Sequence, residues 1–185
     1  MGTGLSRRAA LIGAAMAGAL AGGFAPPLSA HTPYRQWVVY RQKHLLIGAH
    51  RGDPRTYTIA KSLVAALAEE LPDAKARVAR GPRPQRIASL MGTAQMMIAV
   101  ISDSEAAAMV ASSAPFENYR PTPLRRLGVL RDGYGLYAIP DLPDEHAWMV
   151  ADALTHAGLI RQPLPGAIAV HPGAEAYWHG EPVPG

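Results

Sequence analysis

The fold is decided by residues 45–71, LLIGAHRGDPRTYTIAKSLVAALAEEL, in which a polar loop joins a short apolar run to an amphipathic stretch. Residues 45–49 predict a buried β-strand because they are apolar and are followed directly by a loop with Gly and Pro at 50–55. The next stretch has apolar side chains at helical spacing, namely Ile59, Leu63, Ala66, Leu67 and Leu71. Residues 56–71 therefore predict a helix with one face against a sheet.

Two more strand–loop–helix units follow. The second has a strand at 76–79, a loop from 80 and a short helix at about 84–92. The third has a strand at 96–101, which is apolar on both faces as a central strand should be, and a helix at 104–112. Three such units in a row predict an α/β fold with parallel strands flanked by helices.

The pattern changes after a Pro-rich connector at 114–123. Apolar runs at 127–130 and 135–139 flank Asp132-Gly133, which predicts a β-hairpin. A helix is expected from Pro143 or Asp144 to about 157, a loop at 159–169, and a last short helix from 171. We expect one three-layer lobe over residues 45–180, with a mostly parallel sheet and a C-terminal hairpin and helices, and a loose tail at 181–185.

Residues 1–30 read as an export signal. Arg7 and Arg8 precede an uncharged Ala/Gly-rich run at 9–24, and residues 28–30 end it as a small-x-small site of the kind signal peptidase cuts. Paired arginines before a mild apolar run resemble a twin-arginine leader, which exports folded proteins. The predicted mature chain begins at His31, carries an N-terminal extension at 31–44 and is periplasmic. The alternative is an uncleaved membrane anchor.

Composition narrows the function classes. The chain has 185 residues and no Cys, which excludes disulfides, thiolate catalysis and Cys-ligated metal sites. With 18 basic and 14 acidic residues, two of the basic ones in the leader, the mature charge is about +2. That charge is too small to argue for nucleic-acid binding.

Several segments resemble the TAXI family of periplasmic solute-binding proteins, the receptors of certain tripartite transporters. Residues 54–63 are similar to the family's helix start after the first strand, and residues 80–83 correspond to its second loop. Ser102 and Asp103 match the end of its third strand. The most specific match is the His-Pro-Gly-Ala-x-x-Tyr signature at 171–177.

The resemblance implies a type II periplasmic-binding-protein-like fold and a role in transport. Family members have two lobes, whereas here the hairpin runs straight into the late helix, so the resemblance implies a chain shortened to about one lobe. Solute capture in two-lobed receptors depends on closing the lobes over the ligand. A single lobe therefore also favours an acidic partner protein as the ligand.

Candidate binding residues gather where the strands end, because the carboxyl ends of parallel strands meet at one edge. Guanidinium groups and helix N-termini at this edge would attract a carboxylate or a phosphate. The alternative is that the arginines are ordinary solvated loop charges. The residues predicted to bind a ligand or partner are His50, Arg51, Arg55, Tyr57, Arg80, Gly81, Arg83, Ser102 and Asp103.

Metal and catalytic signals are weak. No two of the seven histidines have the His-x-x-x-His spacing. His31 is the metal candidate, because a free N-terminal His could hold copper through its amine and ring. No Gly-x-Ser-x-Gly, Walker or dinucleotide motif is present, so we expect neither an enzyme nor a cofactor.

The sequence thus predicts a non-enzymatic periplasmic protein that binds a small anionic solute or an acidic partner protein through its strand-end loops. The first alternative is an accessory subunit or chaperone of an exported redox enzyme, which would explain a folded-export leader. The second is a copper-binding module that uses His31.

Overall fold

The computed structural model describes residues 43–185. The predicted leader, His31 and nearly all of the extension at 31–44 lie outside the described residues. Within 43–185, no helix combines the length and the apolar character needed to cross a membrane.

The three predicted strand–helix units are present in the predicted order. The first two strands begin one residue later than expected, and each of the first three ends one or two residues further on. The elements of these units are β1 (Leu46–His50), α2 (Pro54–Glu70), a 3₁₀ turn η1 (Pro72–Ala74), β2 (Arg77–Gly81), α3 (Pro84–Gly92), β3 (Ile98–Ser102) and α4 (Asp103–Ala111).

The predicted hairpin and late helices follow. Asp132 and Gly133 in the turn have positive φ angles of 59° and 78°, the left-handed backbone that an Asp-Gly hairpin turn requires. The hairpin strands begin earlier than expected, and a bulge lies between Arg126 and Gly128. These elements are β4 (Arg125–Val129), β5 (Tyr134–Ala138), α5 (Asp144–His156) and α6 (Pro172–Trp178).

All five strands form one open sheet in the order β2-β1-β3-β5-β4. β1 pairs in parallel with β2 and β3, whereas β5 is antiparallel to both β3 and β4. The sheet is therefore mixed and not mostly parallel as predicted, because the returning hairpin strand β5 runs opposite to the other four and makes two of the four pairings antiparallel. β3 holds the central position that its apolar sequence predicts.

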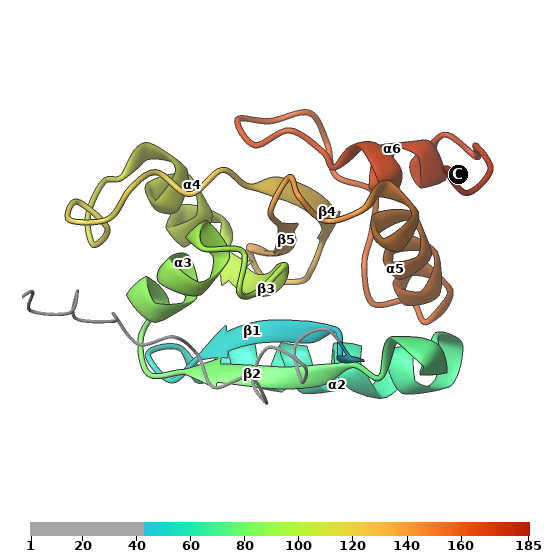
Figure 1. Cartoon of the computed structure of the whole chain (residues 1–185), viewed down its shortest axis with the longest axis horizontal. Coiled ribbons are helices and arrows are strands. Elements are labelled where there is room, and N and C mark those ends of the chain that lie inside the picture. The colour runs from blue at the N-terminus through green and yellow to red at the C-terminus, as the bar shows by residue number, and fades with distance from the viewer. Residues whose placement is uncertain (1–42) are drawn as a thin grey trace, which may run out of the picture. The chain divides into compact units, whose positions relative to one another are not determined.

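Helices cover both faces of the sheet. In Figure 1, α3 and α4 lie to the left of the central strands and α5 and α6 to the right. On one face, Leu63 and Leu67 of α2 join a buried cluster that includes Val100 of β3 and Leu154 of α5. A second cluster contains Met91 of α3, Met109 of α4 and Tyr137 of β5. Two apolar clusters on one sheet make a single α/β lobe.

The His-Pro-Gly-Ala signature forms the joint between α5 and α6. A Cβ on Gly173 would lie 1.9 Å from the carbonyl oxygen of Asp144, so only glycine lets α6 approach α5 this closely. His171 is fully buried beside it, with Nδ1 3.5 Å from Oδ1 of Asp144. Burial lowers the pKa of His171, although the nearby Asp144 carboxylate acts in the opposite direction. Tyr177 packs edge-on against Trp148, with ring centroids 5.3 Å apart.

Candidate functional site

The predicted site edge is formed by the carboxyl ends of β1, β2 and β3, and the amino end of β5 lies at the same edge. α2, α3 and α4 all begin there. The backbone N–H of Arg51 donates to the carbonyl of Gly81 at 3.0 Å, which holds the first loop against the end of the second strand. The backbone N–H of Asp103 donates to Gly133 at 2.8 Å, which places the hairpin turn beside the start of α4. The fold thus brings three predicted loop regions together.

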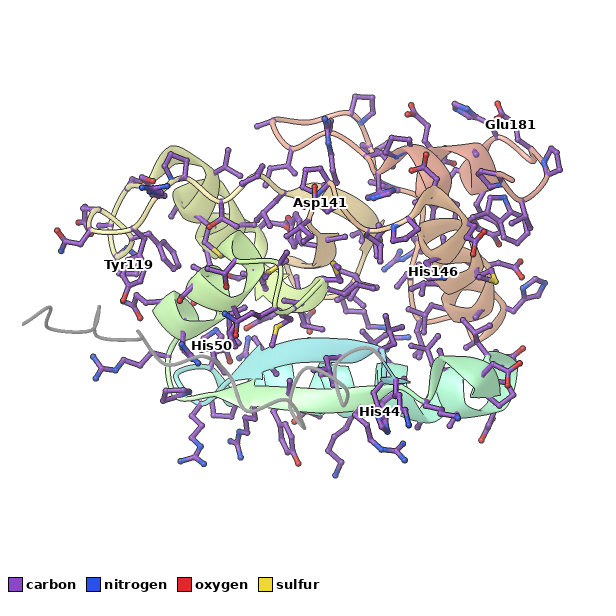
Figure 2. All side chains as sticks on the ribbon, viewed as in Figure 1. His44, His50, Tyr119, Asp141, His146 and Glu181 are labelled. Atoms are coloured by element: carbon purple, nitrogen blue, oxygen red, sulfur yellow. The ribbon has the colours of Figure 1, made fainter. Side chains whose placement is uncertain are left out.

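His50 lies beneath this edge rather than on it. The sequence prediction placed His50 in an exposed loop, but it is the last residue of β1 and only 1% exposed. Its Nδ1 accepts a hydrogen bond from the backbone N–H of Asp53 at 3.2 Å, so the ring hydrogen is on Nε2 in the neutral form. Nε2 is 3.3 Å from Oε2 of Glu105, to which it donates. Figure 2 shows His50 at the opposite end of β1 from His44.

Glu105 joins β3 and β1 from the first turn of α4. Its Oε2 also accepts from the hydroxyl of Ser102 at 3.1 Å, while that hydroxyl oxygen accepts from the backbone N–H of Glu105. Burial alone would raise the pKa of Glu105. The hydrogen bonds and charge of His50, with the bonds from Ser102, outweigh burial and hold that pKa below its ordinary value. Because His50 and Ser102 both bind the same carboxylate, they are not arranged as base and nucleophile.

Asp53 is the N-cap of α2 and a second linking carboxylate. Its Oδ1 accepts from the backbone N–H of Arg55 at 2.9 Å, and its Oδ2 accepts from the hydroxyl of Tyr134. Burial and the adjacent Asp53 carboxylate raise the pKa of Tyr134. The hydroxyl of Thr56 donates to the carbonyl of Asp53 at 2.7 Å and accepts from the backbone N–H of His50 at 3.1 Å, so the loop before α2 is fixed at both ends.

Asp103 is the third carboxylate at this edge, and it too is occupied. Its Oδ1 lies 3.0 Å from Nη2 of Arg126 and accepts from the hydroxyl of Tyr137 at 2.6 Å. Burial and the bond to Asp103 raise the pKa of Tyr137. The ring of Tyr137 passes over Gly135, where a Cβ would lie 2.6 Å from a ring carbon. A glycine at that position lets the hydroxyl reach the start of α4.

The arginines take the outer positions. Arg51 and Arg83 are exposed in loops, as predicted, whereas Arg55 is exposed in the first turn of α2, which begins at Pro54 and not at residue 56 as predicted. Arg80 and Gly81 belong to β2, because this strand continues past the predicted end at 79 into the backbone ladder with β1. Gly81 is buried, whereas the side chain of Arg80 is exposed and its guanidinium carbon lies 4.3 Å from the centroid of the Tyr57 ring.

We call Arg51, Arg55, Arg80 and Arg83 the basic rim. The ion pairs found among residues 43–185 involve other cations, and none includes a rim arginine. The three carboxylates of the edge have partners within the fold, while the rim arginines are exposed, with Arg80 over the Tyr57 ring and Arg55 close enough to Tyr134 to oppose the rise in its pKa. The edge therefore presents positive charge outward.

Metal ligation has no support in the described part of the chain. Among residues 43–185, no group of three or more His, Asp or Glu side chains could hold a metal ion. His31 lies outside the described residues, so copper binding there stays a prediction.

No protein-family model matches the chain, and no curated protein matches it. Function is therefore inferred from the geometry of the edge.

Sequence reasoning missed Glu105, Arg126, Tyr134 and Tyr137. Glu105 had a local signal, because Ser102-x-x-Glu105 is the capping-box pattern that marks a helix start. The other three come from the hairpin, and their contacts depend on how it pairs with β3. No spacing in the sequence shows that register.

Proposed function

We propose that this chain is an exported, non-enzymatic binding protein that recognises acidic groups on a partner protein through the basic rim. It is built on a single lobe of the type II periplasmic-binding-protein kind, similar to the TAXI receptors of tripartite transporters, and works in the periplasm. The three strand–helix units, the returning hairpin and the tightly packed residues of the His-Pro-Gly-Ala signature support this assignment of the lobe.

One observation carries the proposal. At the strand ends, Asp53, Asp103 and Glu105 are each satisfied by a neighbour within the fold, while the rim arginines have no acidic partner among the described residues. Exposed guanidinium groups match carboxylates, because each presents several N–H donors in a fixed planar fork.

The rim supplies most of the positive surplus in the first half of the described chain. Residues 43–97 contain nine basic and four acidic side chains, and four of those basic side chains are the rim arginines. A field of this kind speeds the approach of an acidic surface and weakens as salt is added, since the Debye length is about 8 Å at physiological ionic strength.

A partner protein fits this edge better than a small solute. Small-molecule sites bury most of the ligand in a concave pocket, and two-lobed receptors achieve this by closing one lobe on the other. In a single lobe the rim forms one open wall. An extended acidic surface can contact several arginines at once without being enclosed.

The test uses defined probes. A ten-residue glutamate peptide is titrated against the mature protein by fluorescence anisotropy at low and at physiological salt. The triple variant Arg51→Ala/Arg55→Ala/Arg83→Ala should bind about tenfold more weakly, since three exposed ion pairs contribute about 0.5 kcal/mol each. Added salt should weaken wild-type binding.

The matched control is the triple variant Lys43→Ala/Lys75→Asn/Arg77→Ala. It removes three positive charges near the amino ends of β1 and β2, away from the rim. Asn is used at 75 because Lys75 has a positive φ of 46°. Equal weakening in both triple variants would show that the rim has no special role. A rise in melting temperature with glutamate, succinate or phosphate, but no peptide binding, would instead identify a small-solute receptor.

Export is tested separately from binding. N-terminal sequencing of protein from the periplasmic fraction should begin at His31. Full-length protein retained in the cytosol would contradict the periplasmic assignment.

A further inference from the structure

A second surface of the molecule contains an open pocket of about 330 Å³ between α6 and the loop at 162–170. Such a volume lies at the lower end of the range that small organic ligands occupy. The principal side chains around it are Pro163, Pro165, Ile168, Val170, Glu175 and Trp178.

The walls of this pocket are mainly apolar and its aromatic side chain is fixed. The indole Nε1 of Trp178 donates to the carbonyl of Leu127 at 3.3 Å, and the ring packs edge-on against Tyr177 at a centroid distance of 4.9 Å. A tryptophan held from two sides is preorganised for a ligand, because binding does not need to immobilise it.

Glu175 gives the pocket its charge preference. Glu175 is exposed. Among residues 43–185, no hydrogen bond or ion pair of its carboxylate is found. Residues 98–185 contain ten acidic and five basic side chains, so this half of the described chain is negative overall. His179 on the pocket wall offers an imidazole for hydrogen bonding.

We propose that this pocket binds a small organic cation, an ammonium or guanidinium group on an apolar body. The apolar part lies among the prolines, Ile168 and Val170. The charged group pairs with Glu175 and lies against Trp178, whose π-system attracts cations. An organic anion is disfavoured here because it would face the Glu175 carboxylate.

This site is separate from the basic rim. In Figure 2, Glu181, which follows α6 closely, and His50 lie on opposite sides of the molecule. The inference therefore does not rest on the proposed function, and either can fail without the other.

The experiment compares three ligands of one shape. Benzylamine, benzyl alcohol and benzoate are titrated into the mature protein, followed by the tryptophan indole N–H signals in ¹H–¹⁵N NMR and by thermal shift. Benzylamine should move one indole signal and raise the melting temperature. Benzyl alcohol should bind more weakly, and benzoate should not bind.

Two variants, each of which replaces one exposed acid, test whether the Glu175 carboxylate binds the cation. Glu175→Gln keeps the size of the side chain and should weaken benzylamine binding about fivefold. Glu69→Gln, an exposed acid on α2 outside the pocket, should leave it unchanged. The proposal is overturned if benzyl alcohol or benzoate binds as tightly as benzylamine, if the two variants behave alike, or if no ligand shifts an indole signal.

Discussion

The two halves of the described chain have opposite net charge, and their charged side chains differ in whether they have partners within the fold. Residues 43–97, which include β1, α2, β2 and α3, have nine basic and four acidic side chains, whereas residues 98–185 have five and ten. In the first half, the rim arginines are exposed and have no acidic partner among the described residues. In the second half, Asp103 and Glu105 are bound within the fold, and the exposed acids include Asp144 and Glu145 of α5 and Glu175 of α6.

Sheet topology explains why this difference matters. Because the strand order is β2-β1-β3-β5-β4, the first half lies at one side of the sheet and the hairpin at the other. The half with the basic surplus and the half with the acidic surplus therefore lie at different sides of the sheet. The lesson is that an almost neutral domain can still present a strong field at one edge.

The largest expected effect concerns the second half. Gly173→Ala places a Cβ against the backbone of Asp144, so α6 must move away from α5. We expect a loss of about 3 kcal/mol or more and a fall in melting temperature of about 10 °C. Urea unfolding and calorimetry measure it.

Gly92→Ala is the matched control for that substitution. The nearest atom to its added Cβ is 3.6 Å away, an ordinary contact, so its stability should be unchanged or slightly higher. A stable Gly173→Ala protein would show that α6 does not depend on the close approach, and the joint described here would be wrong.

An intermediate effect is expected where the two halves touch, at the pair His50–Glu105. The folded pKa of Glu105 is below its ordinary value of 4.5, so the ionised carboxylate stabilises the fold fully above that value. This contribution is lost as pH falls through the lowered pKa. Glu105→Gln should therefore cost about 1 kcal/mol at pH 7 and almost nothing near pH 2.

Urea titrations of both proteins at several pH values measure this difference. Glu117→Gln, an exposed acid outside the cluster, should cost little at any pH. A Glu105→Gln cost that stays constant from pH 7 to pH 2 would show that the carboxylate charge does not join the two halves.

The smallest effect sharpens the description of the first half. Tyr57→Leu removes the ring under Arg80 and should change stability by less than about 0.5 kcal/mol, while glutamate-peptide binding weakens about twofold. Arg80→Lys keeps the charge but loses the flat stacking surface, so it should give a similar result in the same anisotropy assay. Unchanged peptide binding in both variants would remove Arg80 from the rim.

The sequence predicted the fold well because local patterns determine its parts. The periodicity of α2, the all-apolar β3 and the Asp-Gly turn each depend on neighbours along the chain, and their order implies an α/β lobe. The exposed arginines were also predictable, because they follow strands directly. The burial of His50 was not predictable, because its partner Glu105 is 55 residues away.

The hairpin side of the site was beyond sequence reasoning for the same reason. Tyr134 and Tyr137 look like ordinary strand aromatics until the antiparallel register with β3 brings them to Asp53 and Asp103. One bulge in β4 changes which side chains face the edge, and no residue pattern specifies where it falls.

The two outermost strands of the sheet, β4 and β2, have a consequence for self-association. The outer side of β4 is occupied by bridges to Val170 and Arg161. The outer strand β2 of the described sheet has five residues, and its Arg77 and Arg80 are exposed. Like-charged, short edge strands repel each other when two copies meet edge to edge. The two exposed arginines of β2 therefore disfavour aggregation by strand pairing at high protein concentration.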